Sequence, residues 1–598
     1  MRKYGAAIIK GVIITAGLSL YVFHLDDLLS WIVISDMLLF AGAFAVLRVY
    51  RKAGARAVLF SRVMAAIFAM VTVTGQTIWN HNDLSGIIGG AGDFIQSAIK
   101  FSGFFLLYEA LLLRFFLWLE NIQSSTKIVW KRIYFTDNAR SFFLQWAFIY
   151  LAWLPCLLAY WPGTMPYDSP GQIRSSLEFS NMNMQHPIIN TAFMGIFYRI
   201  ALAYNNLELL TILYALAQML IMSCIFSFVV WYMARISLPV WLRLLSLGFS
   251  AFYPFNALFS INMTKDVMHA GAVCLFFVCL MEAARKPKAF FHSFMKMFFF
   301  VITGLLFTIT RNNAWQALII CIPFLVIHFR RHKMKITALL LSIVILHTGY
   351  NALLINVLHT VKGPVAESYP FMMQQFAYVL TKRADTLSER DLADIHSIVP
   401  PEAAAEYNPR YADPVKWHET DDNFSDMPKV LGTWLRIGFK YPIDYVTAFL
   451  ANSMGFWYLD AWINDPMVRR TYIEMAFNTD FDPPFTRRSK IPFLLDMYQK
   501  FANVEGDINK APVVLILMSV ALPFWLLVFV FGVLFYQRSR LWIVLAPLAS
   551  LLFTVMLGPL AYGRYIYPFV ALYPAIVGLI VYSAEPKRQA RRKEPAAE

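Results

Sequence analysis

Long apolar runs recur along the whole chain and are separated by polar segments. Most runs approach the ~20 residues that a helix needs to cross a bilayer, so the pattern predicts an all-α polytopic membrane protein. The candidate spans are 5–24, 29–49, 57–79, 99–119, 143–161, 207–234, 240–260, 266–284, 293–310, 313–329, 335–356, 512–536, 541–558 and 564–583. We therefore expect about 14 transmembrane helices.

The polar segments between these runs predict a division of the chain into five parts. The segment after residue 357 has a globular rather than low-complexity composition, with tryptophans and proline turns, and is expected to fold as a small, mainly helical domain. The parts are an N-terminal extension of four helices (1–142), a transmembrane core (143–356) with an outer loop (162–206), an extracytoplasmic domain (357–510), C-terminal transmembrane helices (511–584) and a basic cytoplasmic tail (585–598).

Lysine and arginine are concentrated in some of the connecting segments and missing from others. The basic segments are RVYRKAGAR, KIVWKRIYFTDNAR, RKPK, RRHKMK, QRSR and the C-terminal tail, whereas HLDD and NHNDLSG carry acids and no bases. Short loops rich in lysine and arginine stay in the cytoplasm. We therefore expect cytoplasmic N- and C-termini.

One apolar segment, residues 186–204, decides the orientation of everything after it. If it crossed the membrane, RKPK and RRHKMK would lie outside; if it lies along the outer surface, the basic loops return to the cytoplasm. Ile189, Phe193, Ile196 and Ile200 share one helical face, and Asn190, Thr191 and Arg199 lie elsewhere. This pattern predicts an interfacial helix.

The composition agrees with a membrane protein and argues against a nucleic-acid-binding protein. The chain is 59% hydrophobic and only 15% charged, and its net charge of +15 is placed in the short loops. This placement indicates membrane topology rather than nucleic-acid binding. The five cysteines all fall inside apolar runs, where they are expected to behave as small hydrophobic residues.

A carboxylate follows the fifth apolar run. Residues 161–173, WPGTMPYDSPGQI, contain three prolines and two glycines, which predicts a rigid, non-helical turn that presents Asp168 and, one turn later, Gln172. An ordinary helix cap explains a lone aspartate before Ser-Pro about as well as a general base does.

Further polar residues mark the ends of later apolar runs. His186 precedes Pro187, which suits a helix start, and NMTKDVMHAG places Lys265 and Asp266 at the beginning of a span. TITRNNAWQA places Arg311 and Asn312 between two spans, and GPLAYGRYIYPF places Arg564 and Tyr565 before the last span. A plain interfacial anchor, a snorkelling arginine or an aromatic belt explains each one separately.

These residues together indicate a functional site more strongly than any one of them does alone. Two arginines, a lysine, a histidine and two carboxylates are predicted on one side of a chain that is poor in charge, and charges near membrane depth are functional candidates. A ligand with a phosphate at the headgroup level and a lipid tail fits them, and a lipid-phosphate sugar donor has this shape.

At these residues the chain resembles the GT-C superfamily of integral-membrane glycosyltransferases, most closely a bacterial branch of it. The resemblance runs through WPGTMPYDSPGQI, QHPIINTAFMG, INMTKDVMHAG, TRNN and GPLAYGRYIYPFVALYP, with NSMGFWYLD in the outer domain. It covers most of the chain from about residue 143, and leaves the first four spans as an extension.

The resemblance implies an enzyme of the bacterial cytoplasmic (inner) membrane with an outward-facing site. It implies a polyprenyl-phosphate sugar donor, inverting transfer with Asp168 as the base, and a glycan, glycolipid or protein acceptor among the membrane lipids. Lys265, Arg311 or Arg564 would stabilise the leaving phosphate, while Gln172 and His186 would orient the donor.

The same resemblance assigns the remaining residues more loosely. Asp266 would pair with a cation or hold the acceptor, Asn312 and Tyr565 would complete the donor site, and outer-domain tryptophans would stack on sugars. The resemblance fixes no cofactor and leaves a divalent cation as an open alternative, because some members bind one through an acidic pair. Asp168 has no acidic neighbour before Glu178.

Three other functions remain open at this point. A lipid-linked oligosaccharide polymerase or ligase would use the same donor but place essential residues in the late outer loop. A lipid-linked sugar flippase or transporter would line a path through the membrane centre with charge, and a structural scaffold would leave the clustered charges unexplained.

Overall fold

The computed structural model describes residues 53–124, 137–166, 168–418, 421–464, 487–505 and 512–591, with isolated positions 10, 11, 13, 14, 473 and 475. The spans expected at 5–24 and 29–49 lie almost wholly outside these residues. In the described part every regular element is helical, and extended backbone pairs only at three isolated bridges. The predicted all-α class is confirmed there.

Seven helices of the described part are long and apolar enough to cross a membrane, so the chain is a multi-pass membrane protein. They are α3 (Ala55–His81), α5 (Ala91–Ser124), α6 (Ala139–Ala159), α9 (Glu208–Arg235), α12 (Lys265–Arg285), α16 (Lys333–Asn356) and the consecutive pair α29 (Gly563–Val570) and α30 (Tyr573–Arg591). Shorter apolar helices accompany them: α8 (Ile188–Ala203), α10 (Val240–Phe252), α14 (Phe294–Ile309), α15 (Asn312–His328), α27 (Leu522–Tyr536) and α28 (Ala546–Met556).

Several runs expected as single helices are divided in the structure. Residues 240–260 form α10 and then α11 (Pro254–Ser260), 512–536 form α26 (Pro512–Met518) and then α27, and 564–583 form α29 and α30. In each case the second helix has a proline in its first turn: Pro254, Pro523 and Pro574. Proline has no amide hydrogen and starts a helix more readily than it continues one.

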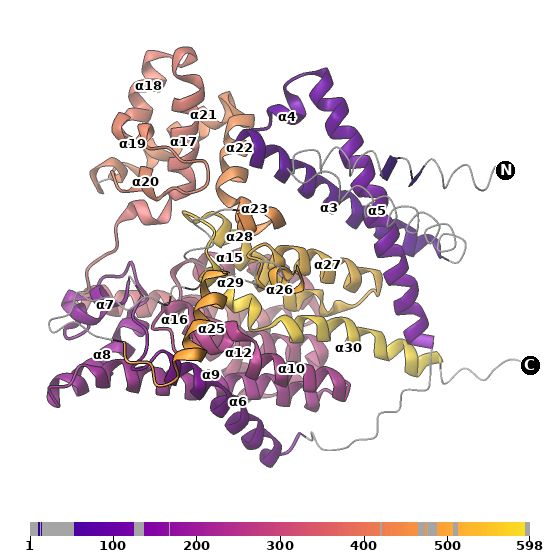
Figure 1. The fold of residues 1–598 in the computed structure, drawn as a ribbon, viewed down its shortest axis with the longest axis vertical. Coiled ribbons are helices and arrows are strands. Elements are labelled where there is room, and N and C mark those ends of the chain that lie inside the picture. The colour runs from indigo at the N-terminus through magenta and orange to yellow at the C-terminus, as the bar shows by residue number, and fades with distance from the viewer. Residues whose placement is uncertain are drawn as a thin grey trace, which may run out of the picture.

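Helix α12 lies inside the main helical body, where it packs against α9, α14 and α29 (Figure 1). Val267, Ala270 and Cys274 on it are fully or nearly fully buried. Gly271 allows the close approach of Met222 on α9, because a Cβ there would meet the methionine sulfur at 3.0 Å. The first residues of α12, Lys265 and Asp266, are therefore held at the end of an enclosed helix.

A second group of helices carries its own hydrophobic core. Phe376, Val379, Ile395 and Ile437 are fully buried in it. The helices are α17 (Pro370–Arg383), α18 (Glu389–His396), α19 (Pro401–Ala405), α20 (Asp413–Lys416), α21 (Met427–Lys440) and α22 (Pro442–Ser453), and Figure 1 shows them gathered at one end of the molecule.

The tryptophans of this region have different environments. Trp434 packs beside the second core, and Trp457 is buried against α3, while Trp417 is 74% exposed. The side chain of Trp462 lies outside the described residues. Core packing therefore accounts for Trp434 and Trp457.

Helix α8 forms within the segment expected to lie at the interface. Asn190 and Thr191 are buried against the protein, and Ile189 and Ile196 are exposed. Part of the predicted apolar face is thus exposed, while Phe193 and Phe197 on it pack against a buried cluster. Asn190 and Thr191 point to the protein interior.

Gly75 on α3 is a contact point between the N-terminal helices and the rest of the chain. A Cβ at this position would overlap the ring and the Cβ of Tyr458, which lies just before α23 (Leu459–Asn464). We expect Gly75→Ala to destabilise the protein by about 1–3 kcal/mol, because the atoms in the way include some near the backbone. The measurement is thermal unfolding in detergent.

Gly349→Ala on α16 is the matched control, because a Cβ there meets no atom of the described residues within 4 Å. Alanine is also the better helix former. Equal melting temperatures for the two variants would contradict the contact at Gly75.

Candidate functional site

The segment that carries Asp168 is tied to the segment that leads into α12. Thr164 forms a bridge with Asn262 and donates from Oγ1 to the Ile261 carbonyl at 3.2 Å. Ser169 Oγ donates to the Met263 carbonyl at 2.6 Å. Two stretches far apart in sequence are thereby joined, and Asp168 is placed beside the first residues of α12.

The sequence-based prediction of a non-helical turn over 161–173 is partly wrong. Residues 169–175 form the short helix α7 (Ser169–Ser175), because Pro170 lies in the first turn, where its missing amide hydrogen is not needed. The non-helical part of the segment includes Gly163, whose φ of 148° suits glycine.

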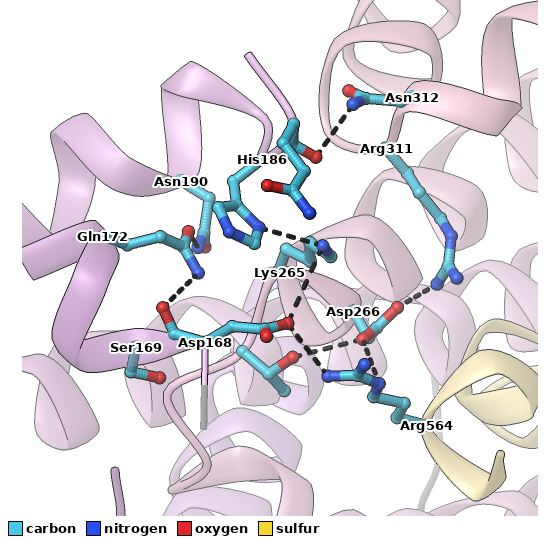
Figure 2. A network of polar contacts seen from close by, with 12 residues as sticks. Asp168, Ser169, Gln172, His186, Asn190, Lys265, Asp266, Arg311, Asn312 and Arg564 are labelled. Atoms are coloured by element: carbon cyan, nitrogen blue, oxygen red, sulfur yellow. Dashed lines mark hydrogen bonds and ion pairs between the residues drawn. The ribbon is translucent and has the colours of Figure 1, made fainter. Parts of the chain in front are cut away.

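Asp168 occupies the cap position of α7, but its side chain makes no capping hydrogen bond. Its Oδ2 instead accepts a hydrogen bond from Arg564 at 3.2 Å and lies 3.9 Å from Lys265 Nζ. Figure 2 shows the carboxylate pointing to these two cations. The capping explanation therefore does not account for this side chain.

Asp266, in the first turn of α12, is a fully buried carboxylate. Arg311, the residue before α15, pairs with its Oδ1, and Thr264 donates to Oδ2 at 3.1 Å. Arg311 also donates from Nε to Asn313 Oδ1 at 2.7 Å. Its side chain is 9% exposed, so it does not extend away to the membrane surface as a snorkelling arginine would.

Arg564, the second residue of α29, connects the two carboxylates. Besides the bond to Asp168, its Nε lies 4.0 Å from Asp266 Oδ2. The Tyr565 ring lies against both guanidinium groups, 4.6 Å from Arg311 and 5.3 Å from Arg564. These are cation–π distances, so the tyrosine stabilises two neighbouring positive charges.

His186 lies beside Lys265, with 3.1 Å between Nδ1 and Nζ. Because an ammonium group only donates, the imidazole accepts at Nδ1. Asn312 donates to the backbone carbonyls of Met184 and Gln185, at 2.9 and 3.1 Å, and so fixes the segment that carries the histidine.

Gln172 contacts Asp168 through the backbone only. Its Nε2 donates to the Asp168 carbonyl at 3.2 Å, and its Oε1 accepts from Asn190 at 3.4 Å and from Thr191 at 3.2 Å. Sequence reasoning placed Asn190 and Thr191 only off the apolar face of α8. The sequence signal for their contact with Gln172 is that two adjacent polar residues lie in the first turn of an apolar helix.

The structure thus brings together all nine residues singled out in the sequence. They are Asp168, Gln172, His186, Lys265, Asp266, Arg311, Asn312, Arg564 and Tyr565. We call this group the charged cluster. Its lysine and two arginines outnumber its two carboxylates.

Burial and this excess of positive charge shift the pKa values of Asp168 and His186. Burial alone would raise the pKa of Asp168, but Lys265 and then Arg564 outweigh it, and the pKa lies below its usual value. Burial, and then the charge of Lys265, lowers the pKa of His186 to about 4. At neutral pH the aspartate is ionised and the histidine is uncharged.

The charged cluster does not fit a divalent cation. Both carboxylates face cations of the protein, and among the described residues no group of three His, Cys, Asp or Glu side chains could hold a metal ion. Hard divalent cations need several oxygen ligands. A phosphate or another anion is the better match for the surplus of positive charge.

The fold and the charged cluster define a multi-pass membrane protein in which the ends of several helices converge on a group of ion pairs with an excess of positive charge. Residues 178–595 match a family described as "Family of unknown function (DUF6020)". This match spans more than half of the 598-residue chain, and the chain belongs to that family. It includes the cluster residues from His186 onward and begins after Asp168 and Gln172. Searches of the curated proteins and of the solved structures returned no significant match.

The low pKa of His186 predicts a pH dependence of stability. Between about pH 4 and pH 6.5 the unfolded chain binds a proton at this histidine and the folded chain does not, so the free energy of unfolding falls as the pH falls. We expect His186→Gln to reduce the stability lost between about pH 7 and pH 5, by on the order of 1 kcal/mol after allowance for partial exposure.

The measurement is thermal unfolding of both proteins in detergent at the two pH values. His396→Gln, on α18 outside the charged cluster, controls for the removal of an imidazole. An identical pH-dependent loss in wild type and His186→Gln would show that His186 is not held neutral by the fold.

Proposed function

We propose that the protein is a membrane glycosyltransferase that moves a sugar from a polyprenyl-phosphate donor to an acceptor hydroxyl with inversion. The observation that carries the proposal is the charged cluster, in which a partly exposed carboxylate stands beside two cations at the ends of apolar helices. The cations suit the phosphate, the apolar helices suit the lipid, and Asp168 suits the hydroxyl. The resemblance to GT-C enzymes supports the same assignment.

Donor binding would change the partners of Asp168. In the structure, Lys265 and Arg564 contact Asp168, whose side chain is 35% exposed. A donor phosphate carries negative charge and would compete for both cations. Loss of these partners would raise the pKa of Asp168 toward its ordinary value, which makes the carboxylate a better proton acceptor.

The proposed transfer is a single displacement at the anomeric carbon of the donor sugar. The acceptor oxygen forms a bond to the anomeric carbon while the bond between that carbon and the phosphate oxygen breaks. The acceptor proton goes to Asp168, and the electron pair leaves with the polyprenyl phosphate, which gains a negative charge. Lys265, Arg311 and Arg564 would stabilise that charge as it develops.

The positions of the charges favour an enzyme over a transporter. Lys265 begins α12, Arg311 directly precedes α15 and Arg564 lies in the first turn of α29, so the cluster gathers at helix ends. A flippase or transporter would be expected to line a path through the membrane centre with charged residues. The Asp168 test below also separates this proposal from a ligase that acts through the late outer loop.

Asp168→Asn tests the catalytic assignment. We expect transfer from a labelled polyprenyl-phosphate sugar to fall by about 10²–10⁴-fold, because the amide cannot accept the acceptor proton. The assay uses purified membranes or protein in lipid nanodiscs. Glu178→Gln, also in the outer loop but hydrogen-bonded to Asn181, is the control and should keep full activity. Wild-type transfer by a folded Asp168→Asn protein would rule out Asp168 as the base.

The proposal includes a topology. About 14 helices would cross the bacterial cytoplasmic membrane, the shorter apolar helices included, while α8 lies along the outer surface and both termini are cytoplasmic. A periplasmic reporter fused after Tyr204 is expected to be active, and a cytoplasmic reporter at the same point inactive. The opposite result would make α8 a membrane span and reverse the side on which later segments lie.

A further inference from the structure

A cavity of about 220 Å³ adjoins the charged cluster and has no role in the chemistry described so far. It lies between the beginning of α8, the end of α14, the beginning of α15 and the C-terminal part of α16. His186 and Asn312 line it on the side of the cluster, and Trp315, His347, Tyr350 and Asn351 line it on the other. At about 30 Å³ for each water molecule, its volume corresponds to roughly seven waters, which suits one ring-sized group rather than a lipid chain.

Two rings in the cavity wall form a rigid aromatic surface. Trp315 and His347 stack with ring centroids 4.4 Å apart and an interplanar angle of 4°. They come from α15 and α16, so the stack is held by two packed helices. The C–H groups of a sugar ring carry slight positive charge and pack favourably on the negative face of an aromatic ring.

The hydrogen bonds beside the stack fix a neutral polar group. Thr308 donates its hydroxyl hydrogen to the Leu305 carbonyl, so its oxygen accepts from His347 Nδ1 at 3.2 Å. His347 Nε2 therefore accepts from Asn351 Nδ2 at 3.1 Å. The amide of Asn351 has a second hydrogen and an oxygen that this bond does not use, and an amide of this kind can both donate to and accept from a hydroxyl.

Among the residues that the structure describes, those that line the cavity include no carboxylate, lysine or arginine. The adjacent charged cluster differs from the cavity, because Lys265, Arg311 and Arg564 belong to the cluster and are not among the residues that line the cavity. A charged group placed in the cavity would lose hydration without gaining an ionic partner there. The cavity is suited to an uncharged group with several hydroxyls.

We propose that this cavity binds the sugar of the donor, and that it selects a neutral sugar ring over an acidic one. The inference rests on the proposed function, because the charged cluster must hold the donor phosphate for its sugar to reach the cavity. Trp315 supplies the apolar contact, Asn351 reads a hydroxyl, and His186 lies between phosphate and sugar.

The test is equilibrium binding of three lipids to the full-length protein in nanodiscs: farnesyl phosphate, farnesyl phosphoglucose and farnesyl phosphoglucuronate. We expect the glucose lipid to bind more tightly than the glucuronate lipid. Trp315→Ala should weaken binding of the glucose lipid by about five- to tenfold and leave farnesyl phosphate unchanged. Asn351→Ala, a smaller change, should do the same more weakly.

Trp241→Ala is the matched control, because Trp241 lies on α10, is 44% exposed and does not line the cavity. The inference fails if the glucose and glucuronate lipids bind equally, or if both cavity variants weaken farnesyl phosphate as much as the glucose lipid. If wild type binds none of the three lipids, the proposed function fails with it; binding of farnesyl phosphate with no gain from glucose overturns only the cavity assignment.

Discussion

The ion pairs of the buried Asp266 carboxylate hold the candidate site together. Asp266 has no exposed surface, and it is partnered by Arg311 from the start of α15 and approached by Arg564 from the start of α29. An uncompensated charge in such a place is very costly, and removing one partner of a buried pair costs roughly 3–5 kcal/mol. Three helix ends are therefore constrained to meet at one point.

This constraint explains why two aspartates in one cluster differ so much. Asp266 uses both oxygens within the protein, and its helix is packed on several sides. Asp168 lies on a connecting segment, is partly exposed, and meets Lys265 and Arg564 at its Oδ2 atom. The buried carboxylate positions the arginines, and the exposed one shares a cation with it. Of the two carboxylates, Asp168 is therefore the one that is accessible to a ligand.

Features of this arrangement that depend on residues close together in the sequence can be predicted, and features that depend on residues far apart cannot. Hydropathy locates helices such as α9 and α12 within a residue or two, because membrane helices are specified locally. It misses the breaks at Pro254 and Pro523, where a single residue changes the backbone without changing the apolar pattern. Charge placement brings Lys265, Arg311 and Arg564 to one side, but it does not choose their partners.

Other features of the site depend on contacts that no local pattern encodes. The hydrogen bond from Ser169, the first residue of α7, to the Met263 carbonyl joins two segments that are far apart in the sequence. It places Asp168 beside the start of α12, where the carboxylate pairs with Lys265 and Arg564 and makes no capping hydrogen bond. The stack of Trp315 on His347 joins two helices whose facing positions are set by packing. Both belong to tertiary structure, so the sequence supplies the residues but leaves their pairing open.

The type of cation at each position agrees with the difference between the buried Asp266 and the partly exposed Asp168. Arginine has a planar fork that can satisfy a carboxylate and stack on a ring at once, and Arg311 and Arg564 do both, with Tyr565 as the ring. Lysine is a compact point charge on a flexible stem. Lys265 lies 3.9 Å from Asp168, which is farther than the 3.2 Å between Arg564 and the same carboxylate, and its other contact is the neutral His186. Among the three cations it is therefore the one that the protein holds least tightly and that can most readily pair with a bound anion.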